Sequence, residues 1–358
     1  MLKKIELLIL IVLITGCFSA CKLDLPTSSD SPGNAGRNDN AAKAMWDPYI
    51  GVHPFAGDAG IQQPHLLKLI QAGALRGVRM GNLQNPEEQR FASWFQGQGV
   101  EILGTFNNEY LRDPNVCQIF SQHVAQNPGV FVWEIGNEIS GFPGCGFVGF
   151  TPEEYMQIAM PLFYYAKQNH PNVRLVIGAV AGNGSSADNL RRMIDAGLNK
   201  LCQDGLEIVP IHFYSWKSTR LAEFQSQIVR LPVSTRIWIT ETNDMPPNWS
   251  TQTGYVAEMY PRMRSALRAE RIYWYVFSEP SDYALVKGLA DGTPVEYSPL
   301  MNLLIGADNT NSSVSDAAVD NFGVSPEILP GMTSRLPDHM NRNGDKPSRH
   351  NPRERRLQ

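Results

Sequence analysis

The sequence predicts an α/β fold, a (β/α)8 or TIM barrel that occupies residues 46–306 as a single domain. Two observations predict it. Short apolar, strand-like runs alternate with helix-like runs eight times in this range, a count and length that match an eight-stranded barrel. Two of the strand-like runs also end in a glutamate, at Glu138 and Glu241. Polar residues at the carboxyl ends of buried strands are typical of the mouth of such a barrel.

The strand-like runs are rich in β-branched and aromatic residues and contain few polar ones. This composition is typical of strands that are buried on both faces. We expect strands at residues 49–55, 77–81, 100–105, 130–135, 173–180, 206–214, 237–241 and 271–277.

The helix-like runs alternate with these strands. Between residues 86 and 96, Phe91, Trp94 and Phe95 fall on one helical face, and Pro86 suits a first turn. Thr151 begins a Thr-Pro-Glu-Glu sequence, which combines a capping residue with acids in the first turn. We expect helices at residues 65–74, 86–96, 115–126, 151–169, 186–200, 221–229, 255–269 and 299–305.

An open, doubly wound sheet is the alternative fold. Such a sheet usually has fewer repeats and a glycine-rich turn directly after its first strand. The one Gly-x-Gly-x-x-Gly sequence, residues 144–149, lies in a loop beyond the fourth strand. It therefore does not predict a dinucleotide site, and we expect no cofactor.

The two ends of the chain differ in composition from the barrel. Lys3 and Lys4, an apolar run over residues 5–14 and the sequence Ile-Thr-Gly-Cys ending at Cys17 resemble the signal peptide and lipobox of bacterial lipoproteins. The resemblance implies cleavage before Cys17 and a lipid on that cysteine, and Cys21 is a weaker candidate. An uncleaved signal anchor is the alternative, and either reading implies export. We expect the signal over residues 1–21, a flexible linker over 22–45 and a disordered tail over 307–358.

Charge and cysteine content exclude several classes of function. A net charge of −4 argues against a nucleic-acid partner, which would need a basic face. Beyond the signal, Cys117, Cys145 and Cys202 form an odd set in which one disulfide is allowed, and the sequence does not say which two would pair. No spacing of cysteine or histidine indicates a metal site.

The candidate site lies at the carboxyl ends of the predicted strands. The sequences Phe-Val-Trp-Glu-Ile-Gly-Asn-Glu-Ile-Ser (131–140) and Arg-Ile-Trp-Ile-Thr-Glu-Thr-Asn (236–243) each run from a buried strand into a glutamate. A carboxylate there is costly unless it faces a solvated cleft. The polar candidates at the strand ends are His53, Arg79, Asn107 or Asn108, Asn137, Glu138, His212, Tyr214, Glu241 and the segment 274–279.

Trp-Glu-Ile-Gly-Asn-Glu (133–138) and Trp-Ile-Thr-Glu (238–241) resemble the strand-four and strand-seven motifs of clan A glycoside hydrolases, retaining (β/α)8 enzymes that include families 5 and 39. The resemblance implies Glu138 as acid/base and Glu241 as nucleophile, without a metal or cofactor. It also implies that Asn137 binds the sugar 2-hydroxyl. The other implied roles are His212 and Tyr214 around the nucleophile, Arg79 as the group that orients and ionises it, and Trp274 (or Phe277) as the floor of the sugar site.

Several of these residues have competing interpretations. Glu134 rivals Glu138, but it lies deeper in the strand, where a structural hydrogen-bonding role is expected. Arg79 could form a buried structural salt bridge, and Glu279 could be a loop charge or a hydroxyl ligand. His53 could equally be structural. The aromatic residues near the loops could stack on sugars, whereas Trp94 and Trp238 suit the core; these loop aromatics are Phe106, Tyr110, Phe142, Trp216 and Trp249.

The sequence thus predicts a lipid-anchored, monomeric retaining glycoside hydrolase of the cell envelope that acts on a β-linked glycan or polysaccharide. A retaining mechanism needs two carboxyl groups about 5–5.5 Å apart. The alternatives are a carbohydrate-binding lipoprotein that has lost turnover and a transglycosylase that remodels an envelope glycan.

Overall fold

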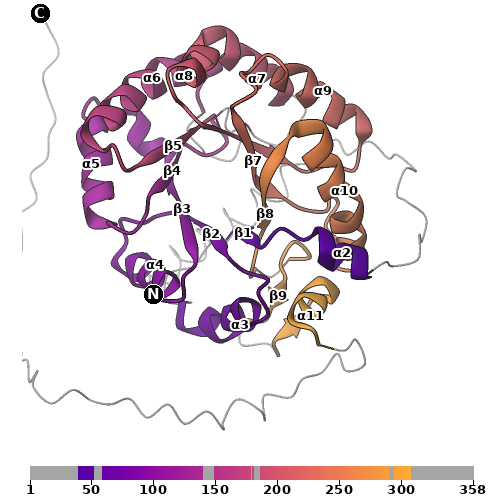
Figure 1. Cartoon of the computed structure of the whole chain (residues 1–358). Helices are drawn as coiled ribbons and strands as arrows, with labels where there is room; N and C mark the ends of the chain where they lie inside the picture. Colours follow the sequence, from indigo (N-terminus) through magenta and orange to yellow (C-terminus); the bar gives the residue numbers. More distant parts are fainter. Residues whose placement is uncertain are drawn as a thin grey trace, which may run out of the picture. The chain divides into compact units, whose positions relative to one another are not determined.

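The structure is a computed structural model that describes residues 39–51, 59–139, 149–178, 180, 186–279, 281–289 and 294–307. Eight parallel strands pair in sequence order, and the eighth returns to the first, so the sheet closes into a barrel. Figure 1 shows the helices as a ring around these strands. The predicted (β/α)8 fold is therefore confirmed.

The barrel strands are β1 Tyr49–Gly51, β2 Gly77–Met80, β3 Glu101–Phe106, β4 Val132–Ile135, β5 Arg174–Ile177, β6 Ile208–Phe213, β7 Arg236–Thr242 and β8 Ala269–Tyr275, and a small antiparallel pair follows as β9 Val286–Lys287 and β10 Glu296–Tyr297. The α-helices are α2 Asp39–Met45, α3 Ala59–Gln71, α4 Pro86–Gly97, α5 Val116–Gln126, α6 Pro152–Asn169, α7 Ser186–Met193, α8 Asn199–Gln203, α9 Ser218–Ile228, α10 Gln252–Leu267 and α11 Pro299–Ile305, with a 3-10 turn η1 Asn108–Arg112 and a π turn η2 Ile194–Leu198.

The predicted start of α6 is confirmed by its capping contacts. Thr151 Oγ1 accepts a hydrogen bond from the Glu154 amide at 3.2 Å, and the Glu154 carboxylate accepts one from the Thr151 amide at 2.8 Å. This reciprocal pair is a capping box. The helix predicted over 186–200 is interrupted by η2, where Gly197 has a φ of +121°. A Cβ at Gly197 would lie 2.9 Å from Met160 Sδ, so the turn packs directly on α6.

The predicted linker over 22–45 differs from the structure in its last seven residues, which form α2. This segment has no hydrophobic period, but Ala42 is fully buried and the helix packs against α10. Residues 22–38 lie outside the described part of the chain, as do the signal over 1–21 and nearly all of the predicted tail over 307–358.

One layer of large side chains fills the barrel interior. Alternate residues along a strand point to the same side, and one buried cluster gathers inward residues of successive strands: Leu103, Val132, Val176, Ile208, Trp238 and Tyr273, with Tyr49 against them. The interior is therefore packed below the mouth, and polar residues in the next layer up, such as Arg79 and Glu134, begin the site.

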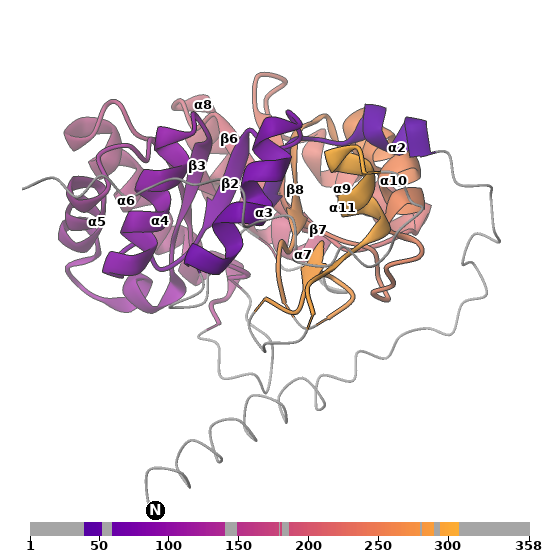
Figure 2. The same ribbon diagram turned by 90° about the horizontal axis from the view of Figure 1, so that it is seen from below.

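The segment between α2 and β1 packs against α10 and β8. Trp46 stacks on Tyr260 with ring centroids 6.0 Å apart, and its indole N–H donates to the Ala74 carbonyl at 3.0 Å. The Asp47 carboxylate accepts hydrogen bonds from Arg264 at 2.6 Å and from the Ile272 amide at 3.1 Å. Figure 2 shows α2 at one end of the barrel and the orange segment that carries β9 and β10 at the other.

Within the described residues, no helix has the length and apolar character that a membrane span requires.

Candidate active site

The turn after β4 carries the first candidate glutamate. Gly136 has a φ of +78°, and Glu138 itself has a φ of +45°, in the left-handed region that non-glycine residues rarely adopt. Such a conformation costs about 1–3 kcal/mol and persists only where neighbouring contacts hold it, as at many functional sites. Ile139 follows as a fully buried residue whose carbonyl accepts from the Phe150 amide at 2.6 Å.

A bulge in β7 brings the second candidate glutamate to the mouth. Ile211 pairs with Ile239, but the next residue of β6, His212, pairs with Glu241, so Thr240 is an extra residue in β7. The bulge lets two successive side chains reach the barrel interior, because Thr240 donates to Glu134 at 2.8 Å while Glu241 accepts from Arg79 at 2.6 Å. Bulges of this kind redirect side chains next to active sites.

Arg79 on β2 connects three acceptors inside the barrel. Its Nε donates to Glu134, its Nη1 to Glu241 at 2.6 Å and its Nη2 to the side-chain oxygen of Asn137 at 2.7 Å. Arg79 and Glu134 are both buried, and a buried guanidinium needs paired acceptors of this kind. Arg79 thus forms the buried salt bridge that was one interpretation of it and also contacts Glu241 at the candidate site, while Glu134 makes the structural hydrogen bonds expected of it. The role of Arg79 in a reaction stays a prediction.

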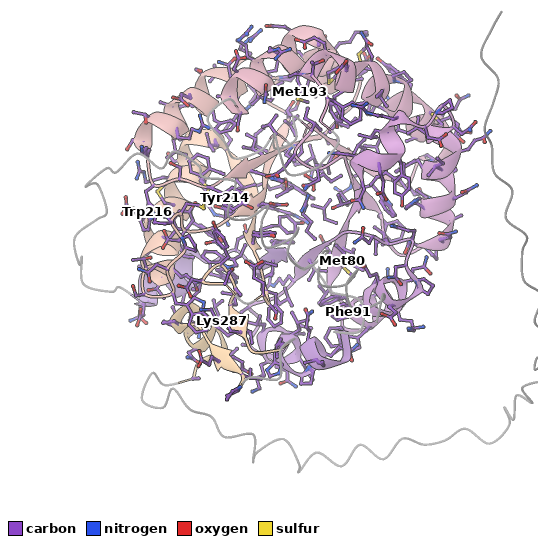
Figure 3. The ribbon with its side chains drawn as sticks, turned by 180° about the vertical axis from the view of Figure 1, so that it is seen from behind. Met80, Phe91, Met193, Tyr214, Trp216 and Lys287 are labelled. Atoms are coloured by element: carbon purple, nitrogen blue, oxygen red, sulfur yellow. The ribbon has the colours of Figure 1, made fainter. Side chains whose placement is uncertain are left out.

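Two residues of β6 and its end surround Glu241. The Tyr214 hydroxyl donates to Glu241 Oε2 at 2.5 Å. His212 Nδ1 lies 3.2 Å from Glu138 Oε1 and 3.4 Å from Glu241 Oε2, so a protonated Nδ1 can donate to either carboxylate. In Figure 3, Tyr214 lies nearer the barrel axis than Trp216 does. The structure thus brings Arg79, Asn137, Glu138, His212, Tyr214 and Glu241 together, as the sequence predicts.

The electrostatics of the cluster distinguish its members. Burial raises the pKa of Glu138, and the negative charge of Glu241 acts in the same direction against the lowering effect of His212. Burial lowers the pKa of His212, but the charges of Glu241 and Glu138 outweigh it and raise that pKa overall. Burial and the Glu241 charge both raise the pKa of Tyr214, so it stays a hydroxyl donor. Glu138 is thereby favoured as a proton donor.

Glu138, His212 and Glu241 each offer an atom within 4.8 Å of the others, a spacing that a metal ion could bridge. Both oxygens of Glu241 already accept hydrogen bonds, one from the Arg79 guanidinium and one from the Tyr214 hydroxyl. A cation on these atoms would face the guanidinium charge directly. The contacts therefore suit a carboxylate pair better than a metal centre, and the expected absence of a metal stays a prediction.

The predicted sugar floor at Trp274 is wrong. Trp274 is fully buried on the outer side of β8, where it packs between Trp46 and Tyr255, and the alternative, Phe277, is buried in the same core. Tyr275 faces the site instead: its ring lies 6.3 Å from that of Tyr214 and it is partly exposed. Alternation along β8 could have identified it, because Tyr275 shares a face with the inward Tyr273.

The remaining predicted residues fall into three groups. His53, Cys17 and Phe142 lie outside the described residues, as does Cys145, while Cys117 and Cys202 are free thiols. Phe106, Trp94 and Trp238 pack in the core or against it, which excludes Phe106 as a sugar platform. Tyr110, Trp216, Trp249 and Glu279 are partly exposed, and their roles stay predictions.

Asparagines occupy the end of β3. Asn107 donates to Asn82 at 2.8 Å, on the rim of the barrel. Asn108 instead binds both backbone groups of Asn137, which places it directly behind the turn that carries Glu138.

Comparisons with known proteins agree with this geometry at the level of the fold. No protein-family model matches the chain, and no curated protein matches it. A family 51 α-L-arabinofuranosidase from Bifidobacterium longum superposes with a TM-score of 0.52 at 12% identity, over 73% of this chain and 72% of that one. A GH39 β-xylosidase from Caulobacter crescentus gives 0.53 at 14%, over 74% and 71%. The chain shares the (β/α)8 fold of these two proteins. At these identities the likeness shows the fold alone.

Proposed function

We propose that this protein is a retaining glycoside hydrolase that cleaves a β-linked glycan through a covalent glycosyl-enzyme. One observation carries the proposal: carboxylate oxygens of Glu138 and Glu241 lie within 4.8 Å of each other across the mouth of the barrel. Retaining enzymes place their two carboxyl groups about 5–5.5 Å apart, whereas inverting enzymes leave about 6.5–9.5 Å for a water molecule.

Glu241 is the nucleophile in this proposal. Arg79 and Tyr214 each donate to one of its oxygens, which favours the ionised form and fixes the direction of the carboxylate. One oxygen attacks the anomeric carbon, forms an ester bond and displaces the leaving group. The positive charge that Arg79 shares between Glu134 and Glu241 holds the carboxylate in place before the attack.

Glu138 serves as general acid and then as general base. Its raised pKa keeps a proton available for the leaving oxygen while Glu241 is charged. Formation of the ester removes the Glu241 charge, so the pKa of Glu138 falls, and the carboxylate can then take a proton from water. The water attacks the anomeric carbon, breaks the ester and returns both glutamates to their first state.

Asn137 and the related folds support a sugar substrate. Arg79 donates a hydrogen bond to the side-chain oxygen of Asn137, which turns the side-chain N–H groups of Asn137 toward a sugar hydroxyl beside the reacting carbon. The two superposed proteins are named as an α-L-arabinofuranosidase and a β-xylosidase, which are both glycosidases.

A covalent trap tests the proposal. The full-length protein is incubated with a panel of 2-deoxy-2-fluoro glycosides that carry good leaving groups, and its intact mass is measured. We expect one sugar per chain, mapped by peptide analysis to Glu241, and labelling that is unchanged in EDTA. Heat-denatured protein is the control. An adduct on another residue, or turnover of a matching glycoside without any adduct, would contradict the proposed nucleophile.

We also propose that the chain is exported and carries a lipid on Cys17. This rests on the sequence alone, namely the basic start, the short apolar run and the Ile-Thr-Gly-Cys sequence. The barrel would then act at the cell envelope, where a polymeric glycan is accessible to it.

A further inference from the structure

The carboxyl group of Glu138 is held mainly through its backbone. Among the described residues its side chain has one hydrogen-bond partner, His212 Nδ1 at 3.2 Å. Glu241, by contrast, is held by Arg79 and by Tyr214. The direction of the Glu138 side chain therefore depends on what fixes the left-handed turn in which this residue lies.

Asn108 continues the strand pairing into that turn. Regular pairing of β3 with β4 ends at Phe106 and Ile135, and the Gly136 amide then donates to the Phe106 carbonyl at 2.7 Å. At the next residue, Asn137, the side-chain amide of Asn108 makes the backbone hydrogen bonds that a neighbouring strand would otherwise make. Its oxygen accepts from the Asn137 amide at 2.8 Å, and its N–H donates to the Asn137 carbonyl at 2.6 Å.

Gly136 makes room for this contact. A Cβ at Gly136 would lie 2.8 Å from the Asn108 side-chain oxygen, in addition to the positive φ that a side chain would resist. On the other side of Glu138, buried Ile139 is held by the Phe150 amide. Hydrogen bonds thus hold the backbone on both sides of Glu138, at Asn137 and at Ile139. Asn108 makes those at Asn137.

We propose that Asn108 is a positioning residue that holds the Asn137–Glu138 turn and so places the acid/base carboxyl. This inference rests on the proposed function for its kinetic consequence, while its structural part stands alone. Loss of Asn108 should let the turn open and move Glu138 away from the leaving oxygen, while the two direct donors to Glu241, Arg79 and Tyr214, lie on other elements and stay in place. A displacement of about 1 Å at a reacting group can lower a rate about 10²-fold.

The first measurement is amide hydrogen exchange in the full-length protein, which needs no substrate. In Asn108→Ala, we expect exchange to become at least about 10-fold faster across residues 136–139, because the Asn137 amide loses its acceptor. Exchange across β2 should stay unchanged. Asn169→Ala is the matched control, because, within the described part of the chain, the Asn169 side chain donates to the Tyr165 carbonyl of its own helix and to nothing else. Unchanged exchange at 136–139 would overturn the inference even if the protein hydrolyses glycosides.

The second measurement is the dependence of kcat on the leaving group, with aryl glycosides of a sugar that the protein hydrolyses. We expect Asn108→Ala to slow poor leaving groups about 10²-fold more than activated ones, because only the former need the acid, whereas a shift of Asn137 affects both alike. Equal losses on both would overturn the positioning role. Asn108→Asp keeps the acceptor and loses the donor, so it should show a weaker form of the same pattern if Asn108→Ala does not fold. Absence of turnover in the unaltered protein would contradict the proposed function, and hydrogen exchange would still decide whether Asn108 holds the turn.

Discussion

At the scale of single residues, the site depends on one buried cation that serves three acceptors. Arg79 has carboxylates on two sides, Glu134 and Glu241, and these charges raise its pKa although burial alone would lower it. Removing either partner would leave a buried charge without full compensation, which is costly. In the proposed mechanism, Glu134 therefore acts through Arg79, which it holds beside Glu241.

Glu241→Gln should reduce turnover by about 10⁴-fold or more, because the amide cannot form the glycosyl ester. The variant keeps an oxygen that can accept from Arg79, so the fold should survive. The rate is measured on the same glycoside that labels the unaltered protein, and circular dichroism checks the fold. Residual activity above a few per cent would exclude Glu241 as the nucleophile.

Glu138→Ala should separate substrates by leaving group and should remove one limb of the pH profile. The raised pKa of Glu138 means that the acid form persists above the usual range of a glutamic acid, and activity falls as pH rises through that pKa. In the variant, the pH profile measured with activated aryl glycosides should lack this basic limb, and azide should increase the rate of their cleavage. The rate of hydrolysis of unactivated glycosides should fall by about 10²–10⁴-fold. A basic limb that persists in the variant would assign it to another group.

Most of the site could be predicted from the sequence because its residues stand at strand ends. Arg79, Asn137, Glu138, His212, Tyr214 and Glu241 all do. The role of Trp274 could not be predicted from its proximity to that edge alone. Whether a residue points to the axis or to the helices depends on strand alternation, and in β7 a bulge changes that alternation between Thr240 and Glu241. A place after β3 made Asn107 or Asn108 a candidate, but the contact of Asn108 with Asn137 could not be predicted, since it depends on how β3 and β4 diverge.

At the scale of elements, the strands could be predicted from the sequence, whereas α2 could not. The strands have a clear hydrophobic pattern and lie where they are predicted, apart from one to three residues at their ends. The last four residues predicted for the first strand, 52–55, lie outside the described residues. α2 has a polar, alanine-containing sequence that forms a helix only because α10 offers a surface for Ala42. Tertiary packing of this kind outweighs local propensity in short helices.

The segment between α2 and β1 also makes stability depend on pH. Burial raises the pKa of Asp47 from 3.8 to about 6, although Arg264 acts in the opposite direction. A carboxyl whose pKa is raised in the folded state contributes stability that is full below its unfolded pKa and is lost as pH rises through the folded pKa. Asp47→Asn should therefore gain stability relative to the unaltered protein between about pH 4 and about pH 7, by roughly 2–3 kcal/mol.

Urea unfolding of both proteins at the two pH values measures this difference. Asparagine keeps an oxygen that can accept from Arg264 and from the Ile272 amide, so these hydrogen bonds are the same in both proteins and only the charge differs. A difference in unfolding free energy that is the same at both pH values would show that Asp47 does not titrate as described.

At the scale of the whole molecule, the barrel and the leading segment have separate tasks. The barrel holds the carboxylate pair, and the residues before it contain the proposed lipoprotein signal. Cys17→Ser should release the protein from membranes into the soluble fraction, because the thiol that receives the lipid is gone. Cell fractionation with an antibody measures the distribution, and Cys202→Ser, in the barrel, is the control. Unchanged membrane association would favour Cys21 or an uncleaved anchor.

The closure of the barrel fixes the order in which the chain can finish folding. β1 pairs with β2 early in the chain, but its second neighbour is β8, through Tyr49–Tyr273 and Gly51–Tyr275. Until β8 joins, the sheet is open and has two unpaired edges, and such edges bind other chains. Pairing across so long a sequence separation is also slow. The edges of β1 and β7 therefore stay unpaired until β8 joins them and closes the barrel.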